Sequence, residues 1–105
     1  MLISTTHTIE NQPVREYVGL VSAEVIVGAH IFKDIFASLR DFFGGRSAAY
    51  EKTIKEAKDM AIKELSDRAQ AMGGHAVIGV HLDYQVMGSK GSMLMVMASG
   101  TAVKF

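Results

Sequence analysis

Residues 47–74 read SAAYEKTIKEAKDMAIKELSDRAQAMGG, and this stretch decides the fold. Apolar side chains recur every three or four residues and form one narrow stripe, made of Tyr50, Ile54, Ala57, Ala61, Leu65, Ala69 and Met72. Charged side chains fill the other faces, in pairs four residues apart such as Glu64 and Arg68. The pattern predicts a long amphipathic helix that Ser47 caps and Gly73-Gly74 ends. Because alanines recur in the stripe, we expect the helix to pack closely against a sheet.

A β-hairpin is predicted after this helix. Apolar residues alternate with other residues and predict a strand with one apolar face, made of Ala76, Ile78, Val80, Leu82, Tyr84 and Val86. Residues 88–91 form the predicted turn. Residues 92–105 form a second strand, whose segment Met93-Leu94-Met95-Val96-Met97 is apolar on both faces.

The chain before the long helix adds two strands and a second helix. Residues 2–5 predict a short strand, and residues 17–28, rich in β-branched side chains, predict a long one. Apolar residues at spacings of three and four predict a helix over 31–43. The predicted fold class is therefore α+β, a small antiparallel β-sheet backed by two helices in β-β-α-α-β-β order. Residues 1–105 form a single domain, since 105 residues leave no room for a second core.

The composition excludes several classes of protein. The absence of cysteine excludes disulfide scaffolds, thiolate zinc sites and thiol nucleophiles. Eleven basic and eleven acidic residues give zero net charge, and no basic stripe favours nucleic acid. The first residues do not resemble a signal peptide, and charged residues interrupt every apolar stretch before it could span a membrane. We therefore expect a cytoplasmic protein without nucleic-acid or membrane partners.

The apolar content points to self-association. Two helices cover only one face of a small sheet, but residues 25–29 and 93–98 place apolar side chains on both faces. The chain has no spare element for the second face, so we expect another copy of the chain to cover it. The sequence thus predicts a homo-oligomer.

Several motifs resemble those of one family. They are Gly44-Gly45-Arg46-Ser47 followed by Tyr50-Glu51, Gly73-Gly74-His75-Ala76-Val77-Ile78-Gly79-Val80 before Asp83-Tyr84, and Ser92-Met93-Leu94-Met95-Val96 before Ser99-Gly100-Thr101-Ala102-Val103. With these motifs, essentially the whole chain resembles the YbjQ-like family of small bacterial proteins. The resemblance implies an α+β subunit in a ring-like homopentamer, and the family carries the description "putative heavy-metal-binding". Two residues depart from the family pattern, because His81 and Gln85 stand where acidic residues are common.

His81 and Asp83 are candidate ligands for a divalent or heavy-metal ion. Two residues apart on a strand, they share a face with Cα atoms roughly 6–7 Å apart, so both side chains can reach one ion. Two ligands do not complete a site, and water or a neighbouring subunit must supply the others, for example through Glu24. The alternative is that both are ordinary polar residues on a solvated or subunit-facing strand.

The methionines allow two interpretations. Met93, Met95 and Met97 alternate on one strand, and thioethers suit Cu(I), but methionine also fills cores and interfaces. The hairpin register decides between them. If Met87 pairs with Ser92, the methionines face the core, whereas a shift of one residue places them beside His81 and Asp83. We favour packing in the core or at an interface over Cu(I) binding, because the chain offers few other soft ligands.

A second candidate site lies where the long helix begins. Gly45, Arg46 and Ser47 could bind an anion, because free N–H groups and the helix dipole favour negative charge there. The alternative is a simple turn in which Arg46 pairs with a nearby carboxylate. We find no catalytic constellation, so an enzyme would need a site shared between subunits. The leading hypothesis is a metal-ion-binding homo-oligomer, and the second is a metal-free oligomer that binds an anion or small metabolite or is purely structural.

Overall fold

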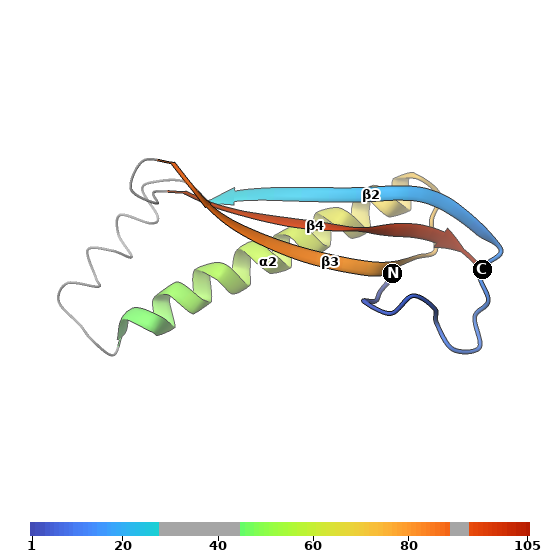
Figure 1. The fold of residues 1–105 in the computed structure, drawn as a ribbon, viewed down its shortest axis with the longest axis horizontal. Coiled ribbons are helices and arrows are strands. Elements are labelled where there is room, and N and C mark those ends of the chain that lie inside the picture. The colour runs from blue at the N-terminus through green and yellow to red at the C-terminus, as the bar shows by residue number, and fades with distance from the viewer. Residues whose placement is uncertain (28–44, 89–92) are drawn as a thin grey trace.

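The computed structural model describes residues 1–27, 45–88 and 93–105. Its elements are β1 (Leu2–Ile3), β2 (Glu16–Val27), α2 (Gly45–Ala71), β3 (Ala76–Met87) and β4 (Met93–Lys104). The strands form one sheet in the order β1-β3-β4-β2, and α2 lies against one side of it (Figure 1). The α+β prediction is confirmed. The helix predicted over residues 31–43 lies outside the described residues.

The sheet is mixed rather than wholly antiparallel. β4 pairs antiparallel with both β2 and β3 along nearly its whole length. The short β1 instead runs parallel to the start of β3, with Leu2 opposite Ala76 and Ile3 opposite Val77. The Ser4 N–H continues this pairing by donating to the Val77 carbonyl at 2.9 Å. The antiparallel pairing of β3 with β4 is as predicted, whereas residues 89–91 of the predicted turn lie outside the described residues. The parallel contact arises from the two-residue strand β1.

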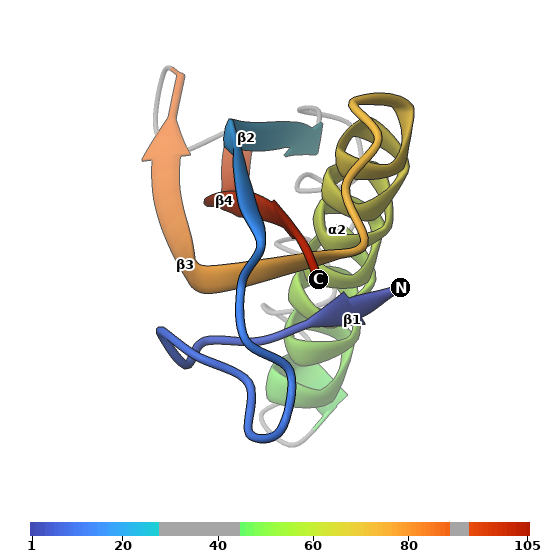
Figure 2. The same ribbon diagram turned by 90° about the vertical axis from the view of Figure 1, so that its right-hand side faces the viewer.

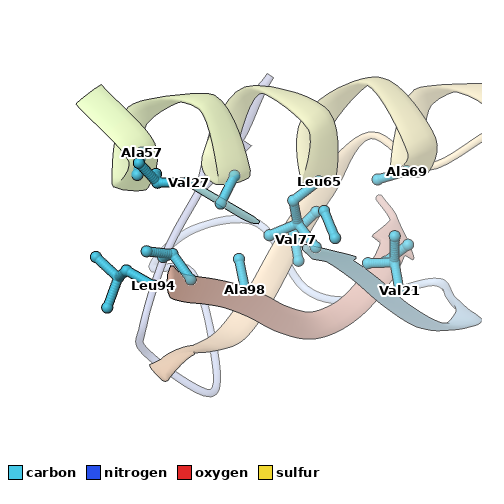
Figure 3. Close-up of a cluster of buried hydrophobic side chains, with 12 residues drawn as sticks. Val21, Val27, Ala57, Leu65, Ala69, Val77, Leu94 and Ala98 are labelled. Atoms are coloured by element: carbon cyan, nitrogen blue, oxygen red, sulfur yellow. The ribbon is translucent and has the colours of Figure 1, made fainter. Parts of the chain in front are cut away.

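The core lies between α2 and the sheet. Its buried members are Val21, Ala23, Val27, Ala57, Ala61, Leu65, Ala69, Val77, Leu94, Val96, Ala98 and Ala102. Figure 3 shows the α2 side chains directed at those of the strands, with Leu65 beside Val77. Among the α2 side chains that the structure describes, Leu65 is the large buried one, and the other three buried positions are alanines. The predicted stripe of small residues thus lets the helix lie close to the strands.

Salt bridges along the exposed side of α2 and a hydrogen bond to β2 help to hold the helix in place. Arg68 pairs with Glu64 at 2.6 Å, as predicted, and also donates from Nη1 to the Ser22 carbonyl of β2 at 2.7 Å. Lys55 Nζ lies 2.8 Å from Asp59 Oδ2, and this hydrogen bond holds the pKa of Asp59 below its ordinary value. The same bond raises the pKa of Lys55. The charged side chains of α2 thus pair away from the core, and its apolar stripe packs against the sheet.

Both ends of α2 can be compared with the ends that the sequence predicts. At its C-terminus the Gly73 N–H donates to the Gln70 carbonyl and the Gly74 N–H to the Ala69 carbonyl, each at 2.9 Å. This is the Schellman arrangement, and the φ of 89° at Gly73 is one that glycine adopts readily. The predicted glycine stop is therefore confirmed. The helix starts at Gly45, so Ser47 lies in its first turn rather than before it.

A β-bulge in β3 changes which face its residues occupy. The register with β4 shifts between Ile78 and His81, so Gly79 and Val80 together stand opposite Gly100. Gly79 has a φ of 60°, the left-handed conformation typical of the first residue in a glycine bulge. The single apolar face predicted for residues 76–86 is therefore wrong. Its members before Gly79 face away from α2, and its members from Val80 onward lie on the α2 side.

The segment between β1 and β2 covers one end of the sheet on the side away from α2. Ala76, Ile78 and Val103 are buried there beneath Ile9, Val14 and Phe105. Figure 2 shows α2 confined to the other side of the sheet. We call the rest of this side the open face. It consists of Leu20, Ser22, Glu24 and Ile26 of β2, Met93, Met95, Met97, Ser99 and Thr101 of β4, and His81, Asp83, Gln85 and Met87 of β3.

Candidate functional site on the open face

The register of the sheet arranges the open face in rows across β2, β4 and β3. The rows are Ser22, Ser99 and His81; Glu24, Met97 and Asp83; and Ile26, Met95 and Gln85; Met93 and Met87 form a final pair. The methionines of β4 therefore run down the middle, with His81, Asp83 and Gln85 on the β3 side and Ser22, Glu24 and the apolar Ile26 on the β2 side.

The three predicted metal ligands lie on this one face. His81 and Asp83 are exposed and two residues apart on β3, as the sequence indicated. Glu24, exposed on β2, lies in the same row as Asp83. The Met97 strand separates these carboxylates, which places their Cα atoms about 10 Å apart. Within residues 1–27, 45–88 and 93–105, no three His, Cys, Asp or Glu side chains gather closely enough to hold a metal ion. The described residues therefore supply an incomplete nitrogen and oxygen site.

The hairpin register settles the position of the methionines. Met87 pairs with Met93, one residue away from the Met87–Ser92 pairing that would turn the methionines inward. Met93, Met95 and Met97 are only partly buried, whereas Leu94, Val96 and Ala98 between them are buried under α2. These methionines therefore do not lie in the core under α2, and packing at an interface between copies stays a prediction. Sequence reasoning also missed Met87, whose place beside them depends on the register alone.

The open face is apolar at its margin and negative in charge. Leu20 is 78% exposed and Ile26 is 55% exposed, both on β2. Glu24 and Asp83 are its carboxylates, and no Lys or Arg belongs to the set of described strand residues that forms it. A face of this kind favours cations near its centre and apolar contacts along β2.

The remaining candidates lie elsewhere. The Gly45, Arg46 and Ser47 anion site stays a prediction, because the side chains of residues 45–50 lie outside the described part of the molecule. Tyr84 lies on the opposite face from Asp83, as its alternation predicted, so the two do not form an acid–base pair on this strand.

The described helical residues include no stretch long and apolar enough to cross a membrane.

Comparison with known proteins finds one matching family model and a solved structure of similar fold. A family model described as "Putative heavy-metal-binding" matches residues 1–105. A crystal structure from Pediococcus pentosaceus, of a protein with unknown function in the DUF74 family, has a similar fold, with a TM-score of 0.68. The alignment covers 98% of this chain and 95% of that chain at 20% sequence identity. At this identity the similarity establishes a shared fold over the full length.

Proposed function

Because this chain belongs over its whole length to the YbjQ-like family, described as putative heavy-metal-binding, we propose that it is a homo-oligomer that binds metal ions on its open face. One observation carries the proposal. Glu24 is far from His81 and Asp83 in the sequence, and yet all three lie exposed on the same side of one sheet. Imidazole and carboxylate groups on such a face are ligands for divalent metal ions.

Self-association completes both the fold and the site in this proposal. The exposed Leu20 and Ile26 give the open face an apolar margin that a second copy would cover. A zero net charge removes long-range repulsion between copies. The ligands that one chain lacks would then come from a neighbouring chain, as a ring of five subunits would allow.

Divalent-metal titration with native mass spectrometry tests this function. We expect the unmodified chain to give an oligomeric mass and to take up Zn²⁺ or Co²⁺ in stoichiometric amounts. His81→Ala and Asp83→Asn should each weaken uptake at least about tenfold, because each removes one of few ligands. His7→Ala is the matched control, since His7 is exposed in the segment between β1 and β2.

Two results would contradict the proposal. A mass of one chain at micromolar concentration would remove the oligomer. Zn²⁺ uptake that is absent, or equal in the His81→Ala and His7→Ala variants, would remove the site and favour the metal-free alternative.

A further inference from the structure

We propose that Met87, Met93 and Met95 form a thioether site for a soft monovalent cation of the copper(I) and silver(I) class. This inference rests on the proposed function, because it names a class of metal for the same open face. It uses different ligands from the His81 and Asp83 site, however, and the two sites can be tested separately.

The hairpin register brings the three methionines together. Met87 and Met93 are direct cross-strand partners, so their Cα atoms lie about 5 Å apart. Met95 follows Met93 on the same face, about 7 Å further along β4. With metal–sulfur bonds of about 2.3 Å, two ligand sulfurs must come within about 5 Å of one another. The methionine side chain is unbranched and flexible, so the sulfurs of these residues can come within this distance of one another.

Core packing does not explain these residues. The chain has seven methionines, and four of them, Met87, Met93, Met95 and Met97, lie on the open face. Neither of the two buried clusters in the described residues includes a methionine. Their partial exposure leaves the sulfurs within reach of a metal ion.

Negative charge lies at one end of the same site. Asp83 and Glu24 both stand opposite Met97, one row of residues from Met95 and two rows from Met87 and Met93. Thioethers are neutral and cannot offset the charge of a bound cation. Two nearby carboxylates can, and the described strand residues of the open face add no positive side chain to oppose them.

Ligand chemistry sets the metal class and the pH dependence. Thioether sulfur is a soft donor and selects Cu(I), for which Ag(I) is a stand-in of the same charge and softness. Thioethers do not bind protons near neutral pH, so a thioether site keeps its affinity at pH 5.

Silver titration of the intact chain, followed by NMR of methionine methyl groups, tests the site. With Ag⁺ at pH 5 and pH 7, we expect the methyl resonances of Met87, Met93 and Met95 to shift as one ion binds per chain. Met60 and Met72, exposed on and just after α2, should not respond. This measurement uses the unmodified protein, so it does not depend on the folding of a variant.

A pair of double variants isolates the ligands. Met93→Leu with Met95→Leu should weaken Ag⁺ binding at least about tenfold, because leucine conserves volume but lacks sulfur. Met60→Leu with Met72→Leu is the matched control and should bind Ag⁺ as the unmodified chain does. His81→Ala should also retain Ag⁺ binding at both pH values.

The outcomes separate this site from the proposed function. Unshifted methyl resonances, or equal Ag⁺ affinity in the two double variants, would overturn the thioether site and leave these methionines with apolar contacts only. Loss of Ag⁺ binding in His81→Ala would overturn it as well. None of these results depends on whether Zn²⁺ binds, and Zn²⁺ uptake that fails would not remove an Ag⁺ response confined to Met87, Met93 and Met95.

Discussion

The two faces of the sheet share the same three long strands but differ in what their side chains do. The face under α2 is made of small and β-branched residues that are buried, such as Ala98 and Val96. Along β4, residues of the open face alternate with these buried residues. The open face carries thioethers, carboxylates and an imidazole that reach the surface. Alternation along the strands, shifted in β3 by the bulge at Gly79, therefore separates the buried residues of the core from the polar and thioether residues of the open face. If this division is correct, substitutions on the two faces should have very different consequences.

The largest expected effect comes from Leu65, the large buried side chain of α2. Its side chain is fully buried against the strands, so Leu65→Ala leaves a cavity at the centre of the core. We expect a loss of about 3 kcal/mol in the free energy of unfolding. Urea denaturation at fixed protein concentration measures it. Met60→Ala, on the same helix at 59% exposure, should change it by less than about 0.5 kcal/mol. Similar losses in both variants would mean that α2 does not pack as described.

The next effect concerns Gly100, where the bulge of β3 meets β4. A Cβ here would lie 2.7 Å from Val77 Cγ1 and 3.0 Å from the Ile78 carbonyl. Gly100→Ala should therefore destabilise the chain by about 2 kcal/mol through overpacking. Adding Val77→Ala removes the closest atom, so the double variant should lose less stability than the sum of the single variants. Strict additivity would show that the strain lies elsewhere.

Much of the fold is predictable from local pattern. The stripe of α2 is spaced at the helical period, and its glycine stop has a backbone signature, so the sequence predicts both. The hairpin follows from two long apolar segments around a turn. The order of the strands and the parallel contact of β1 depend on contacts between distant segments, which periodicity does not encode.

The candidate site is predictable only in part, for a specific physical reason. His81 and Asp83 share a face because they are two residues apart, which needs no knowledge of the fold. The neighbours they acquire depend on a register that one residue can invert, and on a bulge at Gly79 that interrupts the alternation of β3. Gly79 offered a signal for the bulge, because an isolated glycine within a strand pattern is typical of one. No comparable signal in the sequence fixes Met87 opposite Met93.

The smallest effect on folding should come from substitutions on the open face, and these substitutions test the difference between the two faces most directly. Leu20 and Ile26 lose little contact with their own chain on replacement, so Leu20→Ser with Ile26→Ser should change the free energy of unfolding of one chain by less than about 1 kcal/mol. The same variant removes the apolar margin that a second copy would cover, so its oligomer should dissociate at concentrations where the unmodified chain stays assembled. Sedimentation measures the mass, and urea denaturation at low concentration measures the stability.

Large destabilisation of the isolated chain would mean that these side chains support the fold, whereas an unchanged oligomer would place the contact between copies on another surface. Dissociation without unfolding would show that the two faces of one sheet serve different ends, the α2 side holding the chain together and the open side holding its copies.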